Sequence, residues 1–400
     1  MKKIFMISYG GGHSKILIEV YKKIKSEEPK CEIVYLAMTT SKRDLIKEKI
    51  NFKTLENYIH ILGENIEQKN LTAEFGIEYV FNDYVSKKEH DLYNNICLNE
   101  LLKKYNIVYL KKLLSKYGRR IYLPLDSMQN IIKYEKPDLI ITTNAPRFER
   151  AALIVGDKLN VPTLSIEDLY GDPNEADMEI DLELNETYYS KTFGKYICVI
   201  DEFAKNNIEN QLTNKSKVFV TGNPNFDKLI KKKSEKIKRK KNLTKKVLYL
   251  AQSTKFFDVI ISQIQKIALK RKDILFIIKL HPNQKSNLKN TENFLLENKE
   301  LDQMILDSEL IITEYSTSGI EALILEKKVL SIQLDKKKCP IPFEKFCNTL
   351  IVRELSKLES SIDNFINQKF NYKENNFNNL GIAVDKILKV ISKILNGEKI

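Results

Sequence analysis

The chain has 400 residues, a length that suits two domains, each large enough to bury its own core. Apolar residues make up 42% and charged residues 30%, which excludes a disordered protein. No run of about 18 apolar residues occurs, and the apolar start, Ile4 to Tyr9, is too short for a signal peptide. We therefore expect a cytoplasmic protein without a transmembrane helix.

The net charge is +13, and much of the excess lies in residues 228–246, KLIKKKSEKIKRKKNLTKK. Three interpretations are open: a solvated linker, a contact with the anionic inner surface of a membrane, and nucleic-acid binding. The sequence has no zinc-finger or helix-turn-helix signature and no aromatic-rich basic sheet motif, so we expect no nucleic-acid partner. The five cysteines form no CxxC pair, which indicates buried thiols rather than a disulfide framework or a zinc site.

The first half of the chain alternates apolar runs, turns and amphipathic segments, which predicts a parallel sheet with helices on both faces. Residues 41–130 carry several helical patterns and predict an irregular, mainly helical insertion. Outside it, strands are expected at 2–9, 31–38, 138–143, 162–168, 196–200 and 217–222, and helices at 15–29 and around 147–159.

The second half repeats this alternation after a basic stretch, 228–245, that shows no apolar periodicity and is typical of a linker between domains. We therefore predict an N-terminal Rossmann-like domain over 1–227, a C-terminal one over 246–380, and a terminal amphipathic helix within 381–400. In the second domain, strands are expected at 246–253, 273–282, 308–316 and 328–333, and helices at 256–271 and 317–327.

Three glycines, Gly10, Gly11 and Gly12, follow the first expected strand, and His13 stands where the next helix should begin. Without Cβ atoms, backbone N–H groups can approach a ligand closely, and a helix N-terminus favours negative charge. This edge of an open parallel sheet faces the ligand crevice. We expect an acceptor or phosphate loop here, with His13 as a base or a substrate contact. The alternative is a tight turn whose histidine caps the helix.

In the second domain a long apolar strand ends in KLHP, so that His281 and Pro282 stand at the carboxyl edge of the sheet. An imidazole at this position can donate to a phosphate oxygen, and Lys279 and Lys285 could add positive charge. The alternative is an ordinary strand end with a surface histidine.

The sequence TEYSTSGIEAL (313–323) places another polar turn between a buried strand and a helix. Its hydroxyl and backbone donors suit a nucleotide phosphate, and Glu321, about one turn into the helix, could accept from ribose hydroxyls. The alternative is a purely structural capping box from Ser318 to Glu321, with Ser318 or Thr317 as the N-cap. We predict a donor nucleotide site formed by Lys279, His281, Pro282, Ser316, Thr317, Ser318, Gly319 and Glu321.

Two adjacent carboxylates, Glu167 and Asp168, follow a strand of the first domain in SIEDLYGDP. A carboxylate at a strand end can act as the general base that a sugar hydroxyl needs, and burial or like charge can raise its pKa. The alternative is a loop with exposed acids. In the preceding turn, Arg147 or Arg150 could meet an anionic substrate.

Together these motifs resemble the GT-B glycosyltransferases. GGGH is similar to the glycine-rich acceptor loop of MurG-like enzymes. KLHP and STS resemble the HP and Ser/Thr motifs of bacterial polysialyltransferases, and CDP-glycerol glycerophosphotransferases carry a similar pair. IEDLYG is similar to the acidic motif of the sialyltransferase group, although two extra residues separate the acids from Gly171. TGNP and SGIEALILEKKVLSI resemble non-hydrolysing UDP-N-acetylglucosamine 2-epimerases.

The resemblance covers most of 1–30 and 140–335 and implies an α/β protein with two Rossmann-like parallel-sheet domains facing a central cleft. It implies that Glu167 or Asp168 is the general base, with His13 as the second candidate for this role, and that His281 stabilises the leaving phosphate. It also assigns the nucleotide phosphates to Ser316–Ser318 and the ribose to Glu321.

The resemblance further implies an inverting transfer of a sugar from a CMP- or UDP-activated donor to a glycan or lipid-linked acceptor, in capsule or other surface polysaccharide synthesis. No DxD-type metal site is expected, and DLELNE (181–186) is interpreted as an exposed acidic loop, so we expect no metal and no cofactor. Two other functions remain open: a 2-epimerase acting on the nucleotide sugar, and a non-catalytic nucleotide- or nucleic-acid-binding protein.

Overall fold

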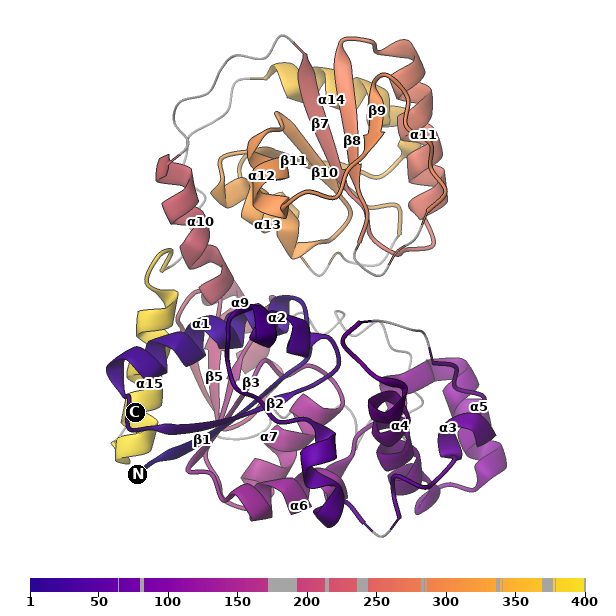
Figure 1. Cartoon of the computed structure of the whole chain (residues 1–400). Coiled ribbons are helices and arrows are strands. Elements are labelled where there is room, and N and C mark those ends of the chain that lie inside the picture. Colours follow the sequence, from indigo (N-terminus) through magenta and orange to yellow (C-terminus); the bar gives the residue numbers. More distant parts are fainter. Residues whose placement is uncertain are drawn as a thin grey trace. The chain divides into compact units, whose positions relative to one another are not determined.

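The computed structural model describes residues 1–63, 65–79, 83–171, 193–212, 216–235, 244–281, 284, 286–335, 339, 341–368, 377 and 379–398, with the backbone alone for 231–235. The chain forms two compact units, one of residues 1–225 with 382–400 and one of residues 226–381 (Figure 1). We call the first unit 1 and the second unit 2. The C-terminal residues 382–400 thus belong to unit 1, together with the N-terminal residues.

Unit 1 is built on a six-stranded parallel sheet in the order β2-β1-β3-β4-β5-β6. Each of the six strands predicted in the first half of the sequence contains one of these strands. They are β1 (Lys3–Ser8), β2 (Glu32–Ala37), β3 (Leu139–Thr142), β4 (Thr163–Ile166), β5 (Tyr196–Val199) and β6 (Lys217–Val220).

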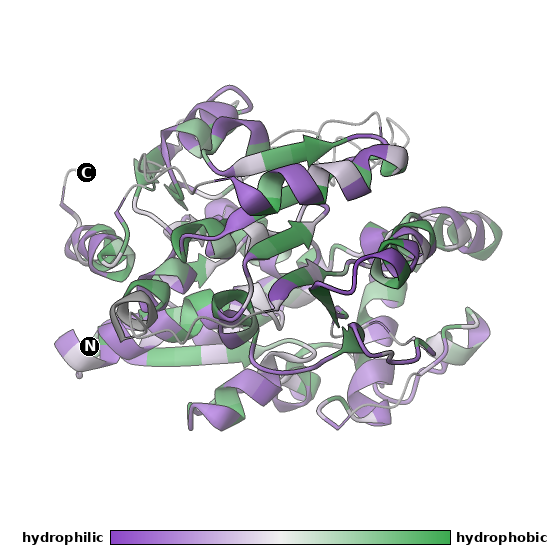
Figure 2. Cartoon of the chain, turned by 90° about the horizontal axis from the view of Figure 1, so that it is seen from above, coloured by the Kyte–Doolittle hydropathy of each residue, from purple (hydrophilic) through white to green (hydrophobic). Residues whose placement is uncertain are grey.

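Both faces of this sheet are covered, which explains why its strands are continuous apolar runs. In β1, Ile4 and Met6 belong to one apolar cluster and Phe5 and Ile7 to the other, as the alternation of side chains along a strand requires. One cluster includes residues of α1 (Gly12–Glu27) and α15 (Ala383–Asn396), which pack together, and the other includes α6 (Leu125–Glu135) and α7 (Phe148–Lys158). A further helix, α9 (Glu202–Glu209), contacts β5 and β6. In Figure 2 the strands are predominantly hydrophobic and the helices have mixed colouring.

The segment 41–130 is mainly helical in the part that the structure describes, as predicted. Its residues add to the apolar cluster on the α6 and α7 face of the sheet. Besides α6, it consists of α2 (Ser41–Lys47), η1 (Leu55–Ile61), α3 (Leu71–Glu74), α4 (Lys87–Leu102), α5 (Ile107–Tyr117) and η2 (Gly118–Ile121).

Unit 2 contains a second six-stranded parallel sheet, in the order β12-β11-β10-β7-β8-β9. Three of the four predicted strands contain β8 (Ile274–Lys279), β10 (Leu310–Thr313) and β11 (Lys328–Ile332), and the fourth matches β7 (Lys245–Leu250), which begins one residue earlier than predicted. The prediction missed the two short edge strands, β9 (Phe294–Leu296) and β12 (Thr349–Val352). After β7, the described residues of the unit form the helices α11 (Phe257–Lys270), α12 (Leu301–Leu306), α13 (Thr317–Ile324) and α14 (Leu358–Asn367), with η3 (Phe343–Lys345) and η4 (Leu355–Lys357). The two parallel sheets confirm the expected α/β class.

Residues 228–235, expected as the first part of a basic linker, are helical instead and belong to α10 (Pro224–Glu235). The apolar signal for this helix comes from Phe226 and Leu229, three residues apart and both buried, at the very start of the basic run. Residues 236–243 of the run lie outside the described residues, and Lys245 and Lys246 at its end already belong to β7. The membrane contact expected of the run stays a prediction.

Gly156 of α7 allows this helix to pack closely on β3 and β4. A Cβ at this position would come within 2.4 Å of Thr163 Cγ2 and 2.8 Å of Ile140 Cδ1. We expect Gly156→Ala to lower the free energy of unfolding by about 1–3 kcal/mol through overpacking, although alanine is the better helix former by about 1 kcal/mol. Urea unfolding followed by circular dichroism measures this, with Ser26→Ala at an exposed position of α1 as the control. Unchanged stability would contradict the packing seen here.

Candidate functional site

The carboxyl edge of the unit 1 sheet gathers the loop after β1, the turn after β3 and the acidic segment after β4. In the strand order, β1 lies between β2 and β3. The chain therefore passes from β1 to β2 on one side of β1, while β3 and the later strands lie on the other side. Such a switch point is where open α/β sheets bind ligands.

His13 lies in the first turn of α1 and is held from two other strand ends. Its Nδ1 is 2.7 Å from Thr143 Oγ1, after β3, and 3.7 Å from Asp168 Oδ2, after β4. The side chain of His13 is 29% exposed, so the ring is anchored yet reaches solvent. The structure thus brings together two residues, His13 and Asp168, that the sequence offered as alternative bases.

Glu149 of α7 lies behind this histidine and is completely buried. Its Oε1 accepts from the backbone N–H of Tyr9 at 2.8 Å. Its Oε2 accepts from Thr143 N at 2.9 Å, from Ala145 N at 3.2 Å and from Thr143 Oγ1 at 2.7 Å. Four donors around one carboxylate tie the end of β1 to the turn after β3.

These contacts determine which nitrogen of His13 carries a hydrogen. Because Glu149 Oε2 is an acceptor, the hydroxyl of Thr143 donates its single hydrogen to it. Thr143 Oγ1 then accepts from His13, so Nδ1 bears the hydrogen and Nε2 of the neutral ring keeps a free lone pair. This is the tautomer that a general base requires.

The charges around His13 favour its protonated form. Burial alone would lower the pKa of His13, but the negative charges of Asp168, Glu149 and Glu167 outweigh burial and raise that pKa above its usual value. Glu167 is therefore an electrostatic neighbour of the histidine, as well as the residue adjacent to Asp168 in the chain. The predicted acidic pair and His13 form one charged cluster.

The glycines of the loop after β1 are required for different reasons. A Cβ on Gly10 would lie 2.1 Å from Thr40 Oγ1 and 2.9 Å from the Thr40 carbonyl carbon, so any side chain there would displace the start of α2. Gly11 is the N-cap of α1 and has φ of 79°, in the region that glycine adopts without strain. Both therefore have a structural role.

Gly12 faces the acidic side of the cluster. A Cβ there would approach Asp168 Oδ2 at 3.8 Å and Asn225 Nδ2 at 4.0 Å. Asn225 Nδ2 donates to the Gly12 carbonyl at 3.3 Å, while its Oδ1 is buried without a hydrogen-bond partner. A Cβ at Gly12 would make only ordinary van der Waals contacts there, so the expected close approach of a ligand at this glycine stays a prediction.

For the turn after β3, the sequence predicted only that Arg147 or Arg150 could meet an anionic substrate. The structure shows further contacts in this turn. The Arg147 guanidinium lies 4.5 Å from the centre of the Tyr9 ring, and the residue has φ of 77°. Thr143 and Glu149 were missed entirely. The sequence did offer a sign for Glu149, because this charged residue stands beside Phe148 and Ala151–Ala152 on an apolar helix face. An unpaired charge there would be costly, which indicates that the glutamate has partners.

In unit 2 the ends of three neighbouring strands are level. Leu250 of β7 pairs with Lys279 of β8 on one side and with Thr313 of β10 on the other. Since β8 and β10 flank β7, His281 and the turn after Thr313 follow strand ends about 10 Å apart on one sheet edge. This confirms their predicted arrangement on alternate strands, with His281 exposed.

The turn after β10 caps α13 and is held by a buried carboxylate. Ser316 is the N-cap, and its Oγ accepts from Ser318 N at 3.2 Å, so the expected caps at Thr317 or Ser318 are wrong by one or two residues. Glu314 accepts from Thr254 Oγ1 at 2.6 Å and from Tyr249 Oη at 3.2 Å, and burial raises the pKa of this carboxyl group.

The structure places three of the other predicted donor-site residues, whose proposed contacts with a nucleotide stay predictions. Lys279 Nζ donates to Asn298 Oδ1 at 3.1 Å and to the Lys299 carbonyl at 2.7 Å, which holds it on the β9 side of the sheet. Gly319 is required by packing, because a Cβ there would come within 2.6 Å of Phe343. Glu321 lies half-buried in α13. Pro282 and Lys285 lie outside the described residues, as does the acidic loop 181–186.

The described residues contain no group of three or more His, Cys, Asp or Glu side chains placed to hold a metal ion. Within the same residues, none of the helices combines the length and the apolar character that spanning a bilayer demands.

Solved structures share this two-sheet architecture over nearly the whole chain. The UDP-GlcNAc 2-epimerase of Methanocaldococcus jannaschii, in complex with UDP-GlcNAc and UDP, matches with a TM-score of 0.64 and 16% identity, over 98% of this chain and 99% of that one. The Neisseria meningitidis enzyme bound to UDP-GlcNAc matches at 0.65 and 16%, over 98% and 100%. A structure described as the glycotransferase of kitacinnamycin matches at 0.56 and 9%, over 99% and 95%. These likenesses confirm the GT-B fold.

Sequence comparison gives two further findings. The UDP-N-acetylglucosamine 2-epimerase of Methanocaldococcus jannaschii is 24% identical over 305 residues, which cover 69% of this chain and 81% of that protein. The family model described as CDP-Glycerol:Poly(glycerophosphate) glycerophosphotransferase matches residues 167–376, from the acidic pair of unit 1 almost to the end of unit 2. On this match, the chain belongs to the CDP-glycerol:poly(glycerophosphate) glycerophosphotransferase family.

Proposed function

We propose that this protein transfers a sugar, or a polyol phosphate, from a nucleotide-activated donor to a hydroxyl group of a glycan or lipid-linked acceptor, with His13 as the general base. The observation that carries the proposal is the chain of hydrogen bonds from His13 through Thr143 to Glu149, which leaves Nε2 free to accept a proton. Family membership supports a transferase, and the fold is one that binds nucleotide sugars in the two epimerase structures.

In the proposed reaction the acceptor hydroxyl attacks the activated carbon or phosphorus atom of the donor. As the new bond to the acceptor oxygen forms, its proton passes to His13 Nε2, and the bond to the leaving nucleotide phosphate breaks. The imidazolium that results lies beside Asp168, whose charge stabilises it. For a sugar donor, this single displacement inverts the configuration at the anomeric carbon.

The donor nucleotide is proposed to bind unit 2. The N-terminus of α13 presents the backbone N–H group of Thr317 and the hydroxyl groups of the same turn, a favourable place for a phosphate, while the N–H of Gly319 donates to the Ser316 carbonyl. His281, from the strand end two positions along the sheet, can donate to a second phosphate oxygen. These neutral and cationic donors would stabilise the departing charge without a metal ion. Transfer should then proceed in the presence of a chelator.

A thermal-shift panel of CMP, CDP, UDP and GDP tests the donor site. A nucleotide at 100 times its Kd should stabilise the protein by about 2.7 kcal/mol, since it binds only the native state. We expect one nucleotide to raise Tm clearly and His281→Ala to remove that shift, while His60→Ala, an exposed histidine of unit 1, retains it. An unchanged shift in His281→Ala would remove this residue from the site.

The transfer itself is tested by incubating the protein with CMP-, CDP- and UDP-activated donors, CDP-glycerol included, and a mixed glycan acceptor. Release of the nucleotide that depends on the acceptor supports the proposal. The second candidate is a 2-epimerase, favoured by the relative that is 24% identical. Formation of the 2-epimer from UDP-N-acetylglucosamine alone, without an acceptor, would decide for the epimerase.

A further inference from the structure

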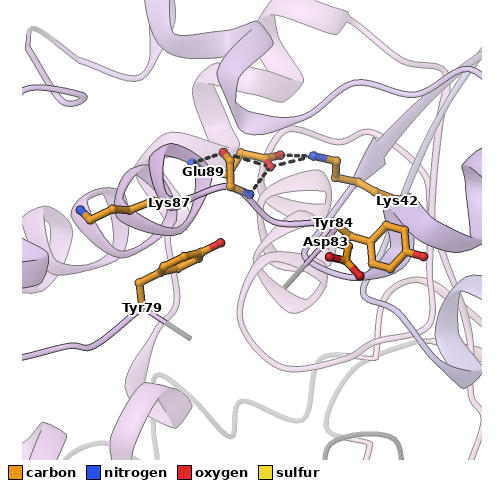
Figure 3. A pocket seen from close by; sticks show the side chains of 7 residues that line it. Lys42, Tyr79, Asp83, Tyr84, Lys87 and Glu89 are labelled. Carbon is orange, nitrogen blue, oxygen red and sulfur yellow. Dashed lines mark hydrogen bonds and ion pairs between the residues drawn. The ribbon is translucent and has the colours of Figure 1, made fainter. Parts of the chain in front are cut away.

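Unit 1 contains an open pocket of about 600 Å³ away from the carboxylate cluster at His13, between α2 and the start of α4 (Figure 3). Its lining combines the aromatic rings of Tyr79 and Tyr84 with charged groups from both helices. A volume of this size suits one or two sugar units. The reaction proposed above assigns no role to it.

The pocket wall is held by the first turn of α4. Ser86 caps this helix by accepting from Glu89 N at 3.1 Å, and Glu89 accepts from Ser86 N at 3.2 Å. Tyr79 Oη donates to the Val85 carbonyl at 2.7 Å, and its ring lies edge-on to His90 with centres 5.3 Å apart. The Tyr79 ring is therefore fixed in place before a ligand arrives.

Three of the four charged residues that line the pocket take part in ion pairs. Lys42 Nζ donates to both carboxylate oxygens of Glu89, at 2.8 and 2.7 Å (Figure 3). Lys87 pairs with Asp91 at 2.6 Å, and Asp83 adds a further carboxylate to the lining. Paired charges offer both donors and acceptors while leaving little net positive field. That suits hydroxyl groups better than phosphates, which need uncompensated cations.

The pocket is linked to the His13 cluster through α2. This helix supplies Lys42 to the pocket, and two residues later Asp44, whose carboxylate accepts from Ser14 Oγ. Ser14 is the neighbour of His13 on α1. Lys42 and Asp44 are separated along the helix axis by about 3 Å, so one short helix borders both places.

We infer that this pocket is a subsite for uncharged sugar units of a glycan. Tyrosine faces can pack against the apolar face of a sugar ring, while Lys42 and Glu89 exchange hydrogen bonds with its hydroxyl groups. That this glycan is the acceptor of the transfer rests on the proposed function. That the pocket binds sugar units does not depend on the proposed function.

The test is direct binding to the full-length protein by isothermal titration calorimetry, which needs no turnover. The probes are neutral hexasaccharides of glucose and of N-acetylglucosamine in different linkages, with poly(glycerol phosphate) as the anionic comparison. We expect a neutral hexasaccharide to bind with an affinity that hardly changes between about 0.05 and 0.5 M salt. Tyr84→Ala should weaken this binding about tenfold, while Tyr84→Phe, which keeps the ring, should retain it.

Tyr134→Ala is the matched control, because Tyr134 is an exposed tyrosine of the same unit that does not line the pocket. Circular dichroism and Tm show that each variant is folded. The inference is overturned if no neutral hexasaccharide binds, if Tyr84→Ala binds as well as Tyr134→Ala, or if poly(glycerol phosphate) binds more tightly in a salt-sensitive way. If the protein shows no transfer but binds a neutral sugar in a way that depends on Tyr84, the subsite is supported. Only its role as an acceptor site is then removed.

Discussion

Replacing His13 with alanine is expected to lower kcat/KM for transfer by about 10²- to 10⁴-fold, the range typical of a positioned general base. Nδ1 is fixed by Thr143 at 2.7 Å, and Asp168 lies at 3.7 Å, so the imidazole is both oriented and stabilised in its charged form. The alanine removes the proton acceptor and leaves the donor site of unit 2 intact. The nucleotide-induced Tm shift should therefore be unchanged while turnover falls.

Two further variants separate the base from its neighbours. Thr143→Val keeps the shape of the side chain but cannot accept from Nδ1, so we expect a smaller loss than for the alanine at His13. Asp168→Asn keeps the size but removes the charge. If Asp168→Asn abolishes transfer while His13→Ala leaves it within a few fold of the wild type, the base is the carboxylate and not the histidine.

The pH dependence gives an independent readout of the same pair. His13 must be neutral to accept a proton, and its pKa is raised, so kcat/KM should rise with pH through an apparent pKa above about 6.5. Asp168→Asn removes the strongest of the charges that raise the pKa of His13. The rising limb should then move to lower pH, and a shift to higher pH would contradict the electrostatic role of Asp168.

The elements that sequence patterns predicted best are the buried parallel strands. A run such as KIFMIS is apolar at every position but its ends because both faces of the strand are covered, and its shortness and the glycines that follow it favour a strand over a buried helix. The edge strands β9 and β12 lacked the signal, being only partly buried and three or four residues long. The start of α10 was missed because its apolar positions, Phe226 and Leu229, stand next to a run of lysines.

The candidate site was predictable where polar residues stand in the segment between a strand end and the next helix turn, as for His13 and Asp168. It was not predictable where a buried charge comes from the middle of a helical turn. Nothing in FERAAL shows that Glu149 points to the backbone of two other segments, because those partners, Tyr9 and Thr143, are set by the strand order. The tautomer of His13 depends on these tertiary contacts and could not have been inferred from its motif.

Glu149 is also where the largest loss of stability is expected. Glu149→Ala would leave the N–H groups of Tyr9, Thr143 and Ala145 buried without their acceptor, at about 1–3 kcal/mol each before water enters the cavity. We expect a total loss of about 3–5 kcal/mol in the free energy of unfolding of unit 1. Hydrogen exchange measures this locally: amides of β1 and β3 should exchange faster, while the strands of unit 2 serve as an internal reference.

Glu149→Gln and Glu74→Ala make this prediction specific. The glutamine can turn its carbonyl oxygen to the donors at the Oε2 position, which leaves only its amide facing the Tyr9 N–H, so the loss should be smaller, about 1–3 kcal/mol. Glu74 is an exposed glutamate of α3, and its removal should have almost no effect. If the amides of β1 and β3 are as well protected from hydrogen exchange in Glu149→Ala as in Glu74→Ala, the Glu149 carboxylate does not hold the two segments together. The orientation of His13 would then need another cause.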